Sequence, residues 1–286
     1  MPRTSLVELA FGDLVPPPVP VTAPRSAAPR QRLLAAVVLG AQGRYAAATT
    51  ALADLRRGAD PVVASLAATT LASHRRQLGG HVAARALDGE ALVALDGAGA
   101  TRVDPDGLDA AGARADALLG LAADNLALGR LAAARRLAAR AAEADDRWRA
   151  TVRGGWVGAE IELAAGRPRE AIAPARRAAE TARVRGSSRH VVKSDIVLGV
   201  ALATAGEPEQ RATALDVVTN AAMAAEKYEL YSLIWVATRV AADLDPGHAE
   251  KYRFRSLEVL HAVLRHADPC VMRIAEDSPW VPERPG

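Results

Sequence analysis

The chain has 286 residues, 50% of them hydrophobic and only 3% aromatic, and its formal net charge is +3 at pH 7. This length and apolar content suffice for one extended core, whereas the small net charge excludes a general nucleic-acid footprint. The single cysteine, Cys270, excludes an intramolecular disulfide and is usual in a reducing cytoplasm, which is the compartment we expect. No uncharged apolar run approaches the roughly 20 residues that a membrane-spanning helix needs, so we expect no membrane insertion.

Residues 1–30 begin with a short amphipathic stretch and continue into a proline-rich segment. The stretch is Leu6–Leu14, and Pro16–Pro18 and Pro20 follow it. Prolines at this density favour an extended, polyproline-like conformation. We therefore interpret residues 1–30 as a flexible N-terminal arm. The alternative is that Leu6–Leu14 docks on the folded region or on another protein.

Beyond this arm, a short helix-breaking unit returns five times between Ala/Leu-rich segments. The glycines of these units are Gly43, Gly80, Gly129, Gly166 and Gly206. They lie 37, 49, 37 and 40 residues apart, and the longest interval contains a loop-forming insertion over 97–107. Repetition at this spacing is typical of stacked helical hairpins, because one hairpin cannot bury its own apolar face.

The pattern predicts an all-α fold, an α-solenoid of about six stacked hairpins over 31–266, with a C-terminal tail or cap over 267–286. Pro61, Pro168 and Pro208 stand where the first turn of a helix tolerates proline. The expected helix pairs are 31–42 with 45–57, 61–77 with 81–96, 108–128 with 131–145, 148–165 with 168–185, 189–205 with 208–226, and 228–244 with 247–266.

Two of the units carry alanines at spacings of four and three, which places each set on one helix face. They are Ala134, Ala138 and Ala141 in one unit and Ala171, Ala175 and Ala178 in the next. With Leu198-Gly199 before Gly206, these positions make the chain similar to the tetratricopeptide repeat family, in the divergent form seen beside bacterial transcriptional regulators. The resemblance covers about residues 31–225. It implies a fold more than a function, because the repeat serves many partners.

The resemblance also implies which residues line a concave groove. Arg153, Trp156 and Glu160 lie on the first helix of one repeat, and Lys193 lies on the equivalent face of the next. Leu119, Ala123, Ile196 and Val200 complete this wall. The chain departs from the family's carboxylate clamp, since Ala123 and Glu160 replace its asparagines.

Arg183, Arg185 and Arg189 are expected at the rim of the groove. An aromatic ring beside several cations suits an acidic peptide, because guanidinium groups pair with carboxylates in a bidentate way. Two alternatives stay open at this point. The arginines of 176–193 also suit the ends of two helices, where they answer the helix dipole, and Trp156 also suits the core.

No catalytic, metal or cofactor signature accompanies these residues. His261 and His266 are five residues apart and so do not share a helix face, and Cys270 has no second thiol beside it. The sequence therefore favours a non-enzymatic, cytoplasmic scaffold that binds a protein or acidic peptide on its concave face. The alternative is a regulatory sensor or adaptor associated with transcription, which binds a small ligand or a nucleic-acid-bound partner. Direct nucleic-acid binding is not expected, because no helix-turn-helix is recognisable.

Overall fold

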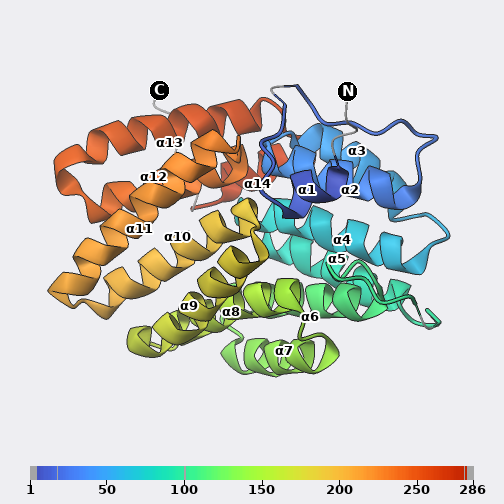
Figure 1. Ribbon diagram of the computed structural model, residues 1–286, viewed down its shortest axis with the longest axis horizontal. Helices are drawn as coiled ribbons and strands as arrows, with labels where there is room; N and C mark the ends of the chain where they lie inside the picture. The colour runs from blue at the N-terminus through green and yellow to red at the C-terminus, as the bar shows by residue number, and fades with distance from the viewer. Residues whose placement is uncertain (1–4, 18, 100, 280, 282–286) are drawn as a thin grey trace.

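The computed structural model describes residues 5–17, 19–99, 101–279 and 281, and within these ranges every regular element is a helix (Figure 1). The expected all-α class is therefore confirmed for the described part of the chain. The first helix, α1, spans Leu6–Phe11, and the last, α14, spans Pro269–Asp277. Between them lie α2 (Pro29–Ala41), α3 (Tyr45–Leu55), α4 (Pro61–Arg76), α5 (His81–Ala94), α6 (Ala110–Ala127), α7 (Leu131–Ala144), α8 (Trp148–Ala164), α9 (Pro168–Arg185), α10 (Ser188–Ala205), α11 (Pro208–Lys227), α12 (Tyr231–Leu244), the short 3-10 helix η1 (Pro246–His248) and α13 (Ala249–Leu264).

Helices α2 to α13 form six pairs of consecutive helices, and each expected pair is present within a few residues of its predicted bounds. The turns between paired helices depend on glycine. Gly43, Gly129, Gly166 and Gly206 have φ angles of 70°, 75°, 71° and 86°. This left-handed region is unstrained only in glycine, so the first helix of each of these pairs ends there. In the second pair the left-handed residue is Gly79, directly before the glycine that marks the turn in the sequence.

Small residues let the helices of a pair approach closely. Ala171, Ala175 and Ala178 on α9 are fully buried, and Ala134 and Ala141 on α7 are almost fully buried. These are the alanine faces that the spacing predicts. Aromatic side chains make up only 3% of this sequence, and many contacts between helices in the core are made by such alanines together with leucine and valine.

The N-terminal segment folds back onto the helix pairs. Helix α1 contacts α2 and α10, and its residues Ala10 and Phe11 are only 2% and 3% exposed. The Ser188 N–H at the start of α10 donates a hydrogen bond to the Gly12 carbonyl oxygen at 3.0 Å. Of the two interpretations of Leu6–Leu14 that the sequence leaves open, the structure therefore shows docking on the folded region.

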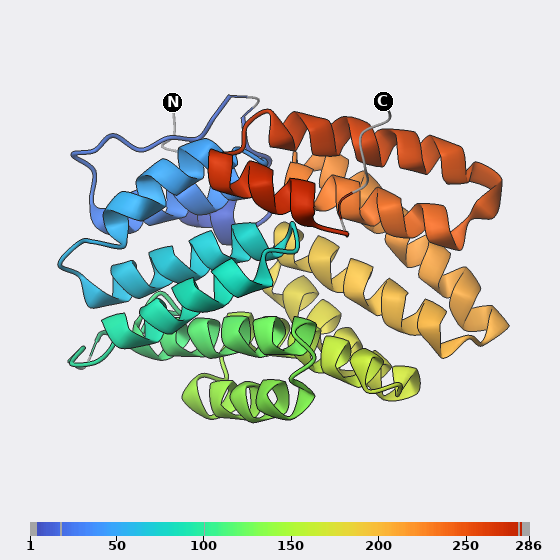
Figure 2. The same cartoon turned by 180° about the vertical axis from the view of Figure 1, so that it is seen from behind.

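The first and last pairs also touch, and the helices form a ring (Figures 1 and 2). The Ala46 N–H donates to the His266 carbonyl oxygen at 2.7 Å, and Thr49 Oγ1 donates to Asp268 Oδ2 at 2.8 Å. Gly43 lies at this junction, where an added Cβ would stand 2.6 Å from Val263 Cγ2. The sequence predicts only that the C-terminal segment covers the last helix, whereas α14 also joins the two ends of the stack.

Helix α14 has a capped N-terminus and covers the last helix pair. Asp268 accepts hydrogen bonds from the backbone N–H groups of Cys270 and Val271, which fixes the first turn of the helix. Val271 is fully buried in a cluster that also contains Leu78 from the α4–α5 turn and Leu260 from α13. Among the described residues, no helix is both long and apolar enough to cross a membrane.

Candidate functional site

A central cavity of about 630 Å³ lies inside the ring, a volume in the range of small-molecule sites. Its wall consists mainly of the first helices of the six pairs, α2, α4, α6, α8, α10 and α12. The lining residues recur at spacings of three and four, so they lie on one face of each helix. On α8 they are Arg149, Arg153, Trp156, Val157, Glu160 and Leu163, and on α10 they are Arg189, His190, Lys193, Ile196, Val197 and Val200.

Most of the predicted groove residues meet in this cavity. The structure places five of the seven candidate binding residues in its wall, namely Arg153, Trp156, Glu160, Arg189 and Lys193. The predicted apolar wall of Leu119, Ala123, Ile196 and Val200 lines it as well. Repeat equivalence places these side chains well because the first helices of neighbouring pairs stand side by side.

Arg183 and Arg185 do not line the cavity. Arg183 Nη2 donates to Asp195 Oδ1 at 2.6 Å. Arg185 Nη2 donates to Asp106 Oδ1 at 2.9 Å, and its guanidinium group stands 5.4 Å from the centroid of the Trp148 ring. Both arginines at the end of α9 are therefore held by acidic partners outside the cavity wall.

Positive charge exceeds negative charge at the end of the cavity nearest to the N-termini of α8 and α10. Arg149 and Arg153 share one carboxylate, that of Asp116 on α6, and the distance from Arg149 Nη1 to Asp116 Oδ2 is 2.7 Å. Arg189 and Lys193 are the other cations of this end, and Glu160 is the other carboxylate. Four cations thus face two carboxylates.

Lys193 and Arg189 make no ion pair with any residue that the structure describes. Burial lowers the pKa of Lys193, although the charge of Glu160 acts in the opposite direction. Burial also lowers the pKa of Arg189 to about 10, and the nearby Arg153 adds to this effect. Both shifts mean that the charged forms are destabilised here relative to water. An anion placed between them would remove that cost.

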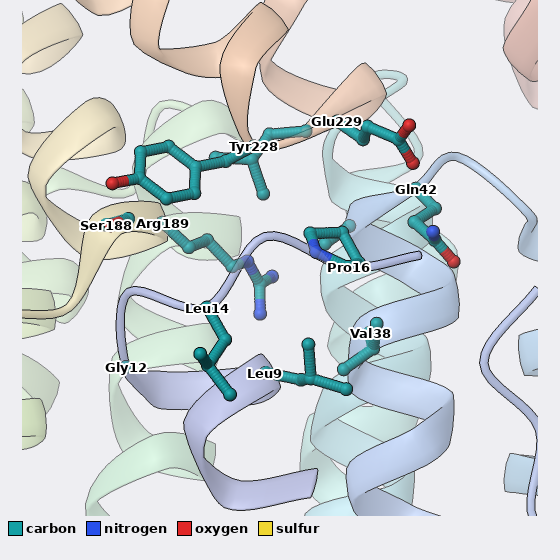
Figure 3. A pocket seen from close by; sticks show the side chains of 12 residues that line it. Leu9, Gly12, Leu14, Pro16, Val38, Gln42, Ser188, Arg189, Tyr228 and Glu229 are labelled. Atoms are coloured by element: carbon teal, nitrogen blue, oxygen red, sulfur yellow. The ribbon is translucent and has the colours of Figure 1, made fainter. Parts of the chain in front are cut away.

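Arg189 lies at the border between the cavity and the N-terminal segment. It also lines a separate pocket of about 20 Å³, where Leu9, Leu14 and Pro16 surround it from one side and Tyr228 from the other (Figure 3). A space of this size holds about one water molecule. The N-terminal segment therefore covers Arg189.

Trp156 is a half-buried wall residue. Its indole N–H donates to Ser194 Oγ at 2.8 Å, and its ring stacks on His190 with centroids 5.7 Å apart. Lys193 Nζ lies 4.9 Å from the Trp156 centroid, a cation–π distance. Burial and the surrounding cations hold the pKa of His190 well below its usual range, so the imidazole stays neutral. The ring of Trp156 thus positions Lys193 while one part of it faces the cavity.

A second charged group lines the cavity from α4. Arg76 binds both Asp88 and Asp124, and its Nε lies 2.7 Å from Asp124 Oδ1. The pKa of Asp88 is raised to about 8, mainly because the carboxyl is buried; the charge of Arg76 acts in the opposite direction, and that of Asp124 adds to the increase. These three side chains therefore pair with one another.

Sequence reasoning missed three residues of the site. Arg149 lies one helical turn before Arg153, and that spacing alone could have revealed it. Asp116 is an acidic residue in an apolar stripe of α6, a signal of a buried ion pair. Phe11 lines the cavity from α1, and no periodic pattern marks it.

Within the described residues, no group of three or more His, Cys, Asp or Glu side chains is arranged to hold a metal ion. Comparison with known proteins adds no relative, because no protein-family model matches the chain and no curated protein is similar to it. The residues and charges of the cavity are therefore the basis for inferring a function.

Proposed function

We propose that this protein is a non-enzymatic binding module of the regulatory sensor type, which takes a small anionic ligand into its central cavity. The observation that carries this proposal is the pair Arg189 and Lys193, two cations in the cavity wall without an ion-pair partner among the described residues. We further propose that the six helix pairs are divergent tetratricopeptide-like repeats, because their alanine faces and turn glycines follow that pattern.

A binding role is supported better than a catalytic one. Ser187 and His190 share a hydrogen bond of 2.8 Å, which is the nearest approach to a nucleophile and base beside the cavity. Ser187 is fully buried and does not line the cavity, so a substrate there would not reach its hydroxyl. Arg153 and Lys193, by contrast, line the cavity.

An acidic segment of a partner protein is the second candidate, and the same excess of positive charge favours it. The wall offers a peptide backbone few partners, however. Thr69, Thr70 and Ser73 line the cavity, but each hydroxyl donates to a carbonyl oxygen of its own helix. A buried peptide would lose hydrogen bonds to water without replacement, which costs free energy for each unpaired group. A small anion avoids this cost.

Fluorescence titration with anilinonaphthalene sulfonate, an aromatic anion, tests the proposal. We expect one site in the wild-type protein and about tenfold or more weaker binding in Lys193→Met, since a hydrogen bond to a charged group contributes about 1.5–3 kcal/mol. Lys251→Met is the matched control, because Lys251 is exposed on α13 and distant from the cavity wall. Equal affinity of the two variants for the probe would contradict an anion site at Lys193.

A further inference from the structure

The cavity wall has a cationic part at the N-terminal ends of α8 and α10 and an apolar part at the C-terminal ends of α6, α8, α10 and α12, whereas the polar residues Ser73, Arg76 and Gln77 line it at the end of α4. On α8 and α10 the cations Arg149 and Arg189 stand in the first helical turn, with Arg153 and Lys193 one turn later. Towards the C-terminal ends of the same helices the lining residues become apolar. The apolar end is formed by Leu126 and Ala127 of α6, Leu163 of α8, Val200 of α10 and Val240 of α12.

The cationic end coincides with two helix N-termini. Neither Arg147 before α8 nor Ser187 before α10 caps its helix with a side-chain hydrogen bond. The partial positive charge of a helix N-terminus favours anions and disfavours cations. Four cations at this place therefore raise the local positive potential instead of neutralising it. An anionic group bound beside Lys193 would lower this potential.

The apolar end sets the other half of the ligand. Val236 and Val240 of α12 stand there with Val200 of α10, and none of these side chains can replace a hydrogen bond to water. Against α10 and α12 a sugar, a nucleotide base or a peptide backbone would lose such bonds, whereas a hydrocarbon group would gain free energy from leaving water.

We infer that the ligand is an amphipathic anion, with a single carboxylate or phosphate headgroup beside Lys193 and an apolar body between the C-terminal halves of α6, α8, α10 and α12. This inference rests on the proposed function and adds the chemical class of the ligand. Its head lies beneath α1, because Phe11 lines the cavity at the cationic end and contacts His190 and Trp148. The ring closure leaves a cavity whose volume suits one such molecule and not an extended chain.

Titration calorimetry with butanoate, octanoate and dodecanoate, each below its micellar concentration, tests this division. Affinity should rise by about fourfold for each methylene group that enters the apolar end. Octanol has the same chain and no charge, so its affinity should be lower than that of octanoate by about tenfold or more. Octyl phosphate distinguishes the two headgroups, and binding of either one supports the inference.

Two variants separate head from body. Lys193→Met should weaken octanoate about tenfold and leave octanol unchanged, with Lys251→Met as the control that removes an exposed lysine. Val200→Phe should reduce the affinity for dodecanoate and leave butanoate unchanged, because it fills only the apolar end. If thermal melting shows that Val200→Phe does not fold, Val240→Phe makes the same test from α12.

The possible outcomes distinguish failure of this inference from failure of the proposed function. Anion binding that is independent of chain length, or tighter binding of a tetra-aspartate peptide than of dodecanoate, overturns the amphipathic ligand and leaves the proposed anion site standing. Failure of every anion, including anilinonaphthalene sulfonate, to bind overturns both.

Discussion

Replacing Phe11 with alanine should detach the N-terminal segment and destabilise the protein. Phe11 is 3% exposed and belongs to a cluster with Leu34 and Val38 of α2. Its ring meets Trp148 edge-on at 6.3 Å, and the Arg149 guanidinium stands 5.4 Å from its centroid. Truncation of a buried phenylalanine typically costs about 3–5 kcal/mol. We expect the lower part of this range, about 3 kcal/mol, because α1 is short and terminal and can leave as a unit.

Urea unfolding and limited chymotrypsin digestion measure the two consequences separately. Phe11→Ala should lower the free energy of unfolding and should also expose Leu9 to cleavage, since an undocked helix of six residues is not stable alone. Val19→Ala is the matched control, because Val19 lies in the same segment and is 60% exposed. A flexible arm, as the proline content of residues 1–30 suggests, predicts no difference between the two variants. That result would refute the docking of α1 and the burial of the ligand headgroup beneath it.

Three further predictions concern the ends of the ring and its buried titratable groups. Truncation after Asp268 removes α14 and uncovers the cluster around Leu78, so light scattering should show association of the shortened protein. The folded state holds the Asp88 proton up to about pH 8 whereas the unfolded state releases it near pH 4, so stability falls as pH rises between these values. Urea unfolding should therefore show Asp88→Asn gaining up to about 1.4 kcal/mol per pH unit on the wild-type protein between pH 6.5 and 7.5, and a constant difference would contradict the raised pKa. Burial lowers the pKa of His74 to about 3 and that of His190 well below 6.5. The contribution of these neutral imidazoles to stability is therefore complete above pH 6.5 and is lost as acid protonates the histidines of the unfolded chain. His190→Gln should lose less stability than the wild-type protein between pH 6.5 and 5 in the same assay, and equal losses would count against a neutral buried His190.

The local elements were predictable because their signals are local. Glycines such as Gly129 and Gly166 end helices through their own backbone conformation, and alanine faces follow from spacing along one helix. Ring closure was not predictable in this way. It depends on the rotation between successive pairs, summed over six pairs, and on contacts such as Thr49 with Asp268, which are 219 residues apart. No local pattern encodes that sum.

The residues of the candidate site also differ in how well the sequence predicts them. Trp156 and Lys193 were found because equivalent positions in adjacent repeats face the same side. Arg185 was placed at the groove from its nearness in sequence, yet it binds Asp106, 79 residues earlier in the chain. The sequence does not predict Phe11 as a cavity residue, because the single short helix α1 has no repeat with which it can be aligned. Repeat equivalence thus predicts the wall of the cavity, and tertiary contacts decide which charges remain free to face it.

The cations in the cavity wall lower the stability of the folded chain, which suggests that they serve a function. Each of Arg153, Arg189 and Lys193 has its pKa lowered, with burial as the largest cause in every case, so each charge costs free energy that the folded chain does not recover. Methionine or leucine at Lys193 would fill the same space without that cost. Such buried charges depart from what stability alone favours, and departures of this kind concentrate at functional sites. Asp116 already pairs with Arg149 and Arg153, so the proposed anion would, together with Glu160, balance the charge of Lys193.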